Sequence, residues 1–436
     1  MLNHCFHVWA QEDGAHFQKW AAMFVLFVSP FFKSDTPYFI EAMADIPGVR
    51  LGIISQDSID DLQPHIRHKL AATWRVTDIL SAEQIEWAAR ELQKRMGKAE
   101  RLLAINEQIQ VPVAQVRERL GIPGMGPEVV QRFRNKSLMK DCFRQAGIPC
   151  ARHCAAISAQ QAWDFVELVG YPVCVKPVDG AAAQSTYRVG SSEDLADVLR
   201  ARDPSVRHPL QLEEFVTGQE HSFECFSVDG VPQWHSLSRY IPTPLDVMRN
   251  PWIQWRIVLP REIDSKQYDD AKDIGHRALK ALGMETGMSH MEWFRRGDGS
   301  IAVGEIGCRP PGAQLITITN RAHDMSIYRG WATTLVLGKF EAPPKRKYAA
   351  GVAFLRGLGG GVVSQTHGLQ EVLHEFDDMI TDYQIPQPGQ AASITYEGEG
   401  YIILRHPKTS RVEEALQHIV STVRVEMFHY RGGPAT

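Results

Sequence analysis

The sequence predicts a mixed α/β (α+β) fold divided into several domains. Short apolar runs at Phe24–Val28 and Val49–Ile54 flank a helical stretch at Tyr38–Asp45, the βαβ rhythm of a small parallel sheet. A chain of 436 residues is too long for one core, so roughly two to four domains or subdomains are expected. Later strands and helices alternate without an internal repeat or a low-complexity stretch.

Composition places the chain among ordinary globular proteins. Hydrophobic residues make up 44% and charged residues 22% of the sequence. A formal net charge of −4 argues against a bulk nucleic-acid binder, which usually carries a basic surplus. The seven cysteines form no CxxC pair, so we expect reduced thiols in a cytoplasmic protein rather than a disulfide framework or a zinc knuckle.

The first apolar segment, Trp20–Phe32, is predicted to contain a buried strand. The segment is too short to span a bilayer. It follows one basic residue, Lys19, and no small-residue cleavage site comes cleanly after it, so a signal peptide is not expected. The residues before Met23 are interpreted as an appendage to the fold.

The remaining chain continues as mixed α/β. A Ser81-Ala-Glu-Gln84 sequence is typical of a capping box, and apolar residues follow it at helical spacing. Other helices are expected at 136–146, 267–282 and 412–423, and strands at 102–105, 171–176, 210–215 and 221–228. The stretch 240–258 is interpreted as a long connection that lines or covers a site. No GxGxxG follows an early strand, so a dinucleotide site of that kind is not expected.

The most informative segment is the predicted hairpin within His290–Gly312. Asp298-Gly299 suits a two-residue turn, which places Glu292 directly across from Glu305 on one face of the sheet. Like charges in that position destabilise a sheet unless something compensates them. A divalent cation would do so, because carboxylate oxygens are ligands that Mg²⁺ prefers.

Two further residues belong to this hairpin. His290 faces Gly307 one step along the same face, and Arg309 follows before Pro310-Pro311-Gly312. From the hairpin alone, a metal site and a solvated edge with Arg309 as counter-ion are both open interpretations.

Cationic and small residues upstream suggest a phosphate site. Lys176 ends an apolar strand and precedes the small-residue loop 180–185, whose backbone N–H groups could approach phosphate oxygens. The strand end at 213–216 offers backbone groups to an adenine, and Glu220 offers a carboxylate to a ribose. The alternatives are an exposed lysine and a charged turn between strands.

In order along the chain, these pieces resemble the ATP-grasp superfamily, which includes D-alanine–D-alanine ligase, biotin carboxylase and the bacterial L-amino acid ligases. The resemblance covers roughly residues 100–340. His-x-Glu before the hairpin and Glu-x-x-x-Arg-Pro-Pro-Gly after it look most like the L-amino acid ligase branch. It implies a small parallel α/β domain at 1–125, an ATP-grasp domain at 126–345 with a lid at about 150–215, and a C-terminal α/β subdomain at 346–436.

The resemblance also implies roles for individual residues. The lysines that hold the nucleotide phosphates would be Lys136 and Lys176, and the loop that closes over them would run from Gly180 to Ser185. The hinge under the adenine would be Glu213, Glu214, Phe215 and Val216, with Glu220 on the ribose. The magnesium ligands would be Glu292 and Glu305, Arg309 would face the reacting carboxyl, and His290 would orient a substrate carboxylate or act as a base.

Two features depart from the family pattern. Many members carry Asn two residues after the second glutamate, where this chain has Gly307 followed by Cys308. A second metal would therefore be held less well, or through water. The phosphate loop has one glycine where relatives often have two or three. Cys308 is expected to pack rather than to act as a nucleophile.

The implied activity is ATP-dependent ligation. A carboxylate would be activated as an acyl phosphate and joined to an amine, with ATP and Mg²⁺ (or Mn²⁺) and with amino-acid-like substrates. The acid pocket is expected to use the loop 309–313 and the connection with Trp252, Trp255 and Arg256. We also expect the protein to be a homodimer in the cytoplasm, without nucleic-acid or membrane partners. The alternatives are a carboxylase-type enzyme that uses bicarbonate and a non-catalytic nucleotide-binding protein.

Overall fold

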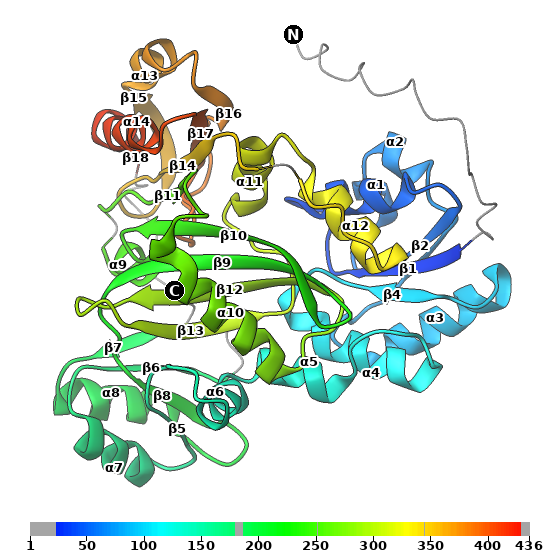
Figure 1. Ribbon diagram of the computed structural model, residues 1–436, viewed down its shortest axis with the longest axis horizontal. Helices are drawn as coiled ribbons and strands as arrows, with labels where there is room; N and C mark the ends of the chain where they lie inside the picture. The colour runs from blue at the N-terminus through cyan, green and yellow to red at the C-terminus, as the bar shows by residue number, and fades with distance from the viewer. Residues whose placement is uncertain (1–22, 179–185, 251, 344, 429–436) are drawn as a thin grey trace.

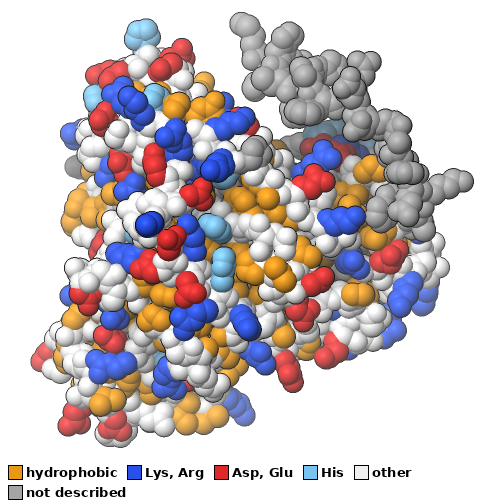
Figure 2. Space-filling model, viewed as in Figure 1, with side chains coloured by type: hydrophobic (Ala, Val, Ile, Leu, Met, Phe, Trp, Pro, Cys, Tyr) orange, Lys and Arg blue, Asp and Glu red, His pale blue; other side chains and the backbone are white. Residues whose placement is uncertain are grey.

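The computed structural model describes residues 23–178, 186–250, 252–343 and 345–428 (Figure 1). The predicted phosphate loop, with Gly180 and Ser185, lies outside the described residues. The mixed α/β fold is confirmed: the described strands form a four-stranded parallel sheet, antiparallel sheets of four and eight strands, and a two-stranded ribbon. No helix in the described ranges has the length and apolar character that a membrane crossing needs. Acidic and basic side chains are interspersed over the face drawn in Figure 2.

The N-terminal unit is the predicted small parallel sheet. Its strands have the order β3-β2-β1-β4. They are β1 (Met23–Ser29), β2 (Val49–Ser55), β3 (Ala72–Arg75) and β4 (Arg101–Leu103). The helices of this unit are α1 (Thr36–Ala44), α2 (Pro64–Arg67), α3 (Ala82–Met96) and α4 (Gln110–Leu120). The prediction of a buried first strand is confirmed, because Phe24–Val28 are at most 1% exposed.

Residues 23–28 of strand β1 are all apolar because both faces of the strand are covered. Val25 and Phe27 pack with Phe39 of α1, whereas Phe24 and Leu26 belong to the core on the α3 side. A parallel strand between two helical layers has no polar face, which explains the continuous apolar run in the sequence.

Two helices lead from this unit into the next sheet. They are α5 (Pro127–Arg134) and α6 (Lys136–Gln145). Asn135 separates them, and its side-chain oxygen accepts hydrogen bonds from the N–H groups of Ser137 and Leu138, both at 3.0 Å. This N-cap starts α6 at Lys136, as the sequence predicts.

A four-stranded antiparallel sheet follows, in the order β5-β8-β6-β7. Its strands are β5 (His153–Ala156), β6 (Val173–Pro177), β7 (Tyr187–Val189) and β8 (Leu210–Glu214). The helices α7 (Ala159–Val169) and α8 (Ser192–Arg202) share a core with it. This unit lies at one end of the molecule, beside the hairpin of the large sheet (Figure 1).

The large sheet has eight strands, in the order β13-β12-β9-β10-β11-β14-β17-β16. Its first five in chain order are β9 (Gln219–Val228), β10 (Val231–Ile241), β11 (Arg256–Leu259), β12 (Gly287–Arg295) and β13 (Ile301–Gly307). The others are β14 (Ala349–Leu355), β16 (Ile380–Gln384) and β17 (Gly400–His406). One sheet thus combines strands from both sides of residue 346, so backbone hydrogen bonds join the two segments.

Helices and a ribbon complete the fold around this sheet. The helices are α9 (Pro244–Arg249), α10 (Asp269–Leu282), α11 (Leu315–His323), α12 (Ile327–Leu337), α13 (Leu369–Glu375) and α14 (Thr409–Thr422). The ribbon pairs β15 (Val362–His367) with β18 (Arg424–Phe428). The predicted helices near 267–282 and 412–423 correspond to α10 and α14.

The expected long connection at 240–258 is shorter in the structure and contains a helix. Strand β10 continues to Ile241, α9 follows, and β11 begins at Arg256. Trp255 is 1% exposed and its ring stacks on Phe354 at a centroid distance of 5.0 Å. Trp255 is therefore a core residue, and burial of its large apolar surface stabilises the fold.

The core beneath β9 and β12 includes a buried tryptophan, and its removal gives a first prediction. Trp293 is fully buried, stacks on His221 at 4.3 Å and donates its indole N–H to the Ser222 carbonyl at 3.4 Å. We expect Trp293→Ala to lower the free energy of unfolding by about 3–5 kcal/mol in urea titrations. The control Trp252→Ala removes a side chain that is 66% exposed. It should change the value by less than about 0.5 kcal/mol, and equal losses would contradict this account.

Candidate active site

The paired glutamates of the hairpin lie as predicted, but the turn does not. Glu292 pairs with Glu305, and His290 with Gly307. Nearer the tip the register shifts, and the N–H of Arg296 donates to the carbonyl of Ser300 at 2.9 Å. Three residues, 297–299, therefore form the tip, and the predicted two-residue turn was wrong.

A bulge at Gly304 restores the pairing that the longer turn would have shifted. Trp293 pairs with Val303 and Glu292 with Glu305, which leaves Gly304 as the extra residue of β13. A Cβ atom at Gly304 would lie 3.0 Å from the carbonyl oxygen of Glu292. Glycine is needed here because the two backbones approach so closely.

The sheet around the glutamates has one apolar and one polar face. Phe223 and Cys225 of β9 lie in the core with Trp293. The alternate residues Glu220, Ser222 and Glu224 belong to the opposite face, since side chains alternate along a strand. Ser222 pairs with Glu292 in register, and Glu224 pairs with His290. This polar face is buried: Glu220, Ser222 and Glu224 are 7%, 0% and 1% exposed.

Charge on this face is unevenly distributed. Burial, reinforced by the negative charges of Glu292 and Glu305, raises the pKa of Glu220 well above its usual value. Burial also opposes ionisation of Glu305, but the positive charges of Lys136 and Lys176 outweigh it and lower its pKa to about 2. The Nζ atom of Lys136 lies 3.1 Å from Oε2 of Glu305. Lys136 thus neutralises the carboxylate of Glu305, whereas the carboxylates of Glu220 and Glu292 repel each other.

These carboxylates fit a divalent cation. Glu292 and Glu305 face each other across the strands, and their negative charges add to burial in raising the pKa of Glu220. A hard cation would relieve that repulsion, and oxygen ligands suit Mg²⁺. Gly307 adds no side chain to this set. A Cβ atom there would meet Oε2 of Glu107 at 3.2 Å, so Glu107 fills the space beside Gly307.

Two lysines and one glutamate form the neighbouring cluster. Lys176 Nζ lies 3.0 Å from Oε1 of Glu213, and Lys140 Nζ lies 3.4 Å from Oε2 of the same carboxylate. Burial alone would lower the pKa of Lys176, but the charge of Glu213 raises it above its usual value. The sequence reasoning missed Lys140. Its position four residues after Lys136, on the same side of a predicted helix, was the available signal.

The predicted adenine hinge divides into inward and outward side chains. Glu213 points to the lysines, whereas Glu214 pairs with Arg152 at 3.1 Å. The Arg188 guanidinium lies over the ring of Phe215, 5.1 Å from its centroid. Val216 is partly exposed. The N–H of Phe215 donates to the carbonyl of Pro172 at 3.3 Å, so this part of the hinge backbone also bonds within the protein.

A small pocket opens between the N-terminal unit and the hairpin. It is lined by Glu107, Phe133, Arg134, Lys136, Met139, His290, Glu305, Ile306, Gly307 and Arg309. Four residues with predicted roles, Lys136, His290, Glu305 and Arg309, thus meet in one cavity. Trp252, Trp255 and Arg256 are not among these lining residues.

Glu107 holds two arginines at the pocket wall. Nη1 of Arg134 lies 2.7 Å from Oε1 of Glu107, and Nε of Arg309 donates to Oε2. Burial alone would raise the pKa of Glu107, but the charges of Arg309 and Arg134 hold it below the usual value. The sequence analysis did not single out Glu107 as a functional residue, because no local pattern marks it.

His290 is held by a second residue that the sequence reasoning missed. Its Nδ1 lies 2.9 Å from Oε1 of Glu224, and its Nε2 lies 3.8 Å from Oε1 of Glu292. Burial alone would lower the pKa of His290, but hydrogen bonds to Glu224 and Glu292 raise it to about 9. The alternation Glu220-x-Ser222-x-Glu224 was the sequence signal for this polar face. Cys308, in contrast, packs as expected, and burial raises the pKa of its thiol to about 12.

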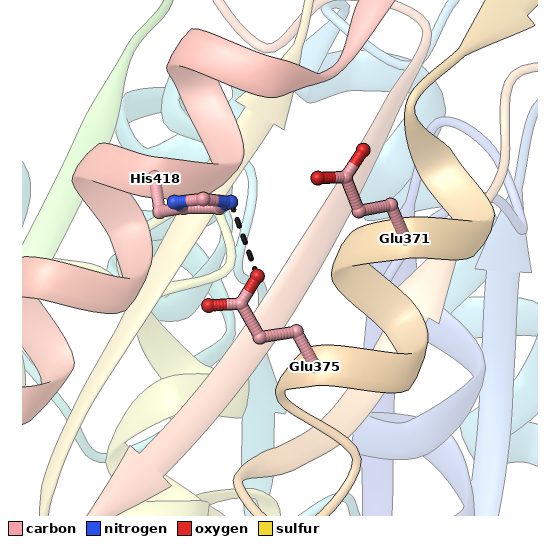
Figure 3. Close-up of side chains that lie close together, drawn as sticks. All are labelled: Glu371, Glu375 and His418. Atoms are coloured by element: carbon pink, nitrogen blue, oxygen red, sulfur yellow. Dashed lines mark ion pairs between the residues drawn. The ribbon is translucent and has the colours of Figure 1, made fainter.

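A separate group of ligand-type side chains lies in the C-terminal part (Figure 3). Glu371 and Glu375 of α13 face His418 of α14, with their ligand atoms within 4.8 Å of one another. His418 Nε2 lies 3.2 Å from Oε2 of Glu375, and both side chains are at least 40% exposed. This arrangement is a surface ion pair, remote from the hairpin in Figure 1.

Comparison with known proteins agrees with this geometry. Residues 141–323 match the family model of the ATP-grasp domain. The L-arginine-specific L-amino acid ligase of Bacillus subtilis is 22% identical over 254 residues, which cover 57% of this chain and 60% of that protein. The uncharacterized protein y4rH of Sinorhizobium fredii is 24% identical over 270 residues, with 57% and 54% covered. The matched region thus spans a little more than half the length of these relatives.

Solved structures share the fold over almost the whole chain. An L-amino acid ligase from Bacillus licheniformis superposes with a TM-score of 0.74 and 16% identity, over 93% of this chain and 99% of that one. An N5-carboxyaminoimidazole ribonucleotide synthetase from Thermotoga maritima gives a TM-score of 0.68 and 16% identity, over 93% and 100%. Residues 141–323 therefore form an ATP-grasp domain, and carboxylate–amine ligases are among the proteins that the chain resembles.

Proposed function

We propose that this protein is an ATP-dependent ligase that activates a carboxylate as an acyl phosphate and couples it to an amine. The observation that carries the proposal is the facing pair Glu292 and Glu305 beside lysines and a pocket lined by Arg309. A carboxylate pair for a metal, cations for phosphates and a guanidinium for a carboxylate are the parts that phosphoryl transfer to an acid requires.

Glu292 and Glu305 would hold Mg²⁺ or Mn²⁺ in this function. When bound, the cation would neutralise phosphate charge and orient the nucleotide for transfer. The side chain that many relatives place at position 307 is missing here, which supports one well-held metal rather than two.

The lysines and the hinge would bind the nucleotide. Lys136 and Lys176 would neutralise phosphate oxygens, with the loop Gly180–Ser185 closing over them. Backbone groups of 213–216 would contact the adenine, and Glu220 would contact the ribose. Glu220 is buried, and its carboxylate oxygens would accept hydrogen bonds from the ribose hydroxyls.

Arg309 would bind the reacting carboxylate and stabilise the oxyanion that forms when the amine attacks. Its planar guanidinium matches both groups in geometry. In the described structure Arg309 pairs with Glu107, so a substrate carboxylate would join or replace that contact. His290 has a pKa of about 9, so it keeps its proton at neutral pH. That supports an orienting hydrogen-bond donor rather than a general base.

Amino-acid-like substrates are the preferred class. The relatives include the L-arginine-specific L-amino acid ligase, an alanine–anticapsin ligase of Bacillus subtilis and a D-alanine–D-alanine ligase of Geobacillus thermodenitrificans. The synthetase folds among the structural neighbours favour one second candidate, a carboxylase-type enzyme that uses bicarbonate. The two candidates differ in whether ADP formation needs an amine. A homodimer in the cytoplasm remains part of the proposal.

The central experiment measures phosphate release from Mg-ATP with the purified chain and a panel of amino acid pairs. We expect release that needs both an acid and an amine, and we expect Glu305→Gln to lower kcat by about 10²-fold or more, since it removes a charged ligand. Release with bicarbonate and without an amine would favour the carboxylase. ATP binding without release from any pair would favour a non-catalytic protein.

A second prediction concerns the phosphate lysine. Lys176→Met should raise the KM for ATP by roughly tenfold or more, because it removes a cation from the phosphate site. The control Lys272→Met removes an ion-paired lysine of α10 instead. Its KM for ATP should match that of the unmodified protein. An unchanged KM in Lys176→Met would show that the lysine does not contact the nucleotide.

A third prediction tests the absence of covalent catalysis. The thiol of Cys308, with a pKa of about 12, stays protonated up to pH 10 and is a poor nucleophile. We expect Cys308→Ala to change kcat by less than about threefold between pH 7 and 9, because no step uses the thiolate. A loss of turnover in a variant that melts like the unmodified protein would contradict the proposed mechanism.

A further inference from the structure

Lys140 is a charged side chain that the proposed mechanism does not use, although it is among the most buried in the protein. The residue is 0% exposed. It lies one helical turn after Lys136 on α6, so both ammonium groups lie on the same side of the helix. A buried ammonium is stable only where acceptors surround it. Two such acceptors lie close to Nζ.

The first acceptor fixes Lys140 in place. Its Nζ donates to the carbonyl oxygen of Gly304 at 3.0 Å. Gly304 is the bulge residue of β13, and its position is set by the close approach of the Glu292 backbone. The ammonium is therefore attached to a rigid part of the sheet.

The second acceptor is shared with the phosphate lysine. Glu213 is 6% exposed and its two carboxylate oxygens face different lysines, Oε2 facing Lys140 and Oε1 facing Lys176. Gln211 donates to Oε1 at 3.3 Å. Burial alone would raise the pKa of Glu213, but Lys140 and Lys176 hold it below its usual value. Glu213 is thus an anion that would be left uncompensated if both lysines were withdrawn.

Binding of a nucleotide would change the group with which Lys176 pairs. Under the proposed function, Lys176 must direct its charge to phosphate oxygens, and Glu213 competes for the same ammonium group. Leaving a buried carboxylate without a counter-ion is strongly unfavourable. A second cation that stays with Glu213 removes that penalty.

We propose that Lys140 is a positioning residue for nucleotide binding: it is the fixed counter-ion of Glu213 and thereby frees Lys176 to pair with the phosphates. This inference rests on the proposed nucleotide-binding function. It assigns Lys140 no contact with the nucleotide, and it predicts an effect on phosphate binding without an effect on adenine binding.

Calorimetric titration of the full chain with ADP and with adenosine, without Mg²⁺, tests this role. Lys140→Met keeps most of the side-chain volume and removes the charge. We expect its Kd for ADP to rise about tenfold or more, because Glu213 then retains Lys176. Its Kd for adenosine should change by less than about twofold, since the hinge backbone is unaltered. Lys272→Met, which removes another ion-paired lysine, should leave both values unchanged.

The double variant Lys140→Met with Glu213→Gln separates this role from simple damage to the fold. Removing the carboxylate as well should return the Kd for ADP to within about threefold of the unmodified protein, because Lys176 no longer has a competitor. The double variant lacks both the Lys140 ammonium and the Glu213 carboxylate, so it also tests the role of Lys140 if Lys140→Met alone does not fold.

Three results would overturn the role of Lys140. The first is an unchanged Kd for ADP in folded Lys140→Met, and the second is an equal loss of affinity for ADP and adenosine in that variant. The third is a double variant that binds ADP poorly although circular dichroism shows that it is folded. Failure of the unmodified protein to bind ADP would instead refute the proposed function itself.

Discussion

The site depends on one constraint, the close approach of two carboxylates across a two-stranded hairpin. Glu292 and Glu305 are opposite residues of β12 and β13, and like charges in that position repel. The surrounding residues reduce the repulsion: Lys136 pairs with Glu305, and His290 lies between Glu224 and Glu292. A cation at the pair would complete the compensation. The same repulsion that costs stability therefore makes the hairpin selective for positive charge.

The sheet supports this charge because its two faces are chemically different. Trp293, next to Glu292 in sequence, points into an apolar core with Phe223 and Met291. The packed face is rigid, so the alternate residues on the other face are held at fixed spacing. The bulge at Gly304 adjusts that spacing by one residue, and Lys140 donates to its carbonyl. Because side chains alternate along a strand, the residues that stabilise the core lie on one face and the site residues lie on the other.

The pocket forms where the N-terminal unit meets the hairpin. Glu107 follows β4 at the carboxyl end of the parallel sheet, which is where open α/β sheets usually place ligand-binding residues. Its carboxylate reaches Arg309, beyond the end of β13, and Arg134 of α5. A residue of the first unit thus orients the arginine that we assign to the substrate carboxylate.

What the sequence determined by itself was local. The buried first strand and the start of α6 at Lys136 could be predicted, because apolar runs and capping residues are encoded by neighbours in the chain. Glu292 pairs with Glu305 as predicted, but only because the bulge at Gly304 offsets the longer turn. The ATP-grasp assignment followed from the order of such local pieces.

The tertiary structure alone decided the contacts between distant segments. Lys140 and Gly304 are 164 residues apart, and Arg309 and Glu107 are 202 residues apart. The three-residue tip and its compensating bulge, and the burial of Trp255, also depended on packing against other elements. No periodicity or spacing rule links residues so far apart. Their pairing is set by how the sheets and helices pack, because a buried charge is stable only beside the partner that the fold brings to it.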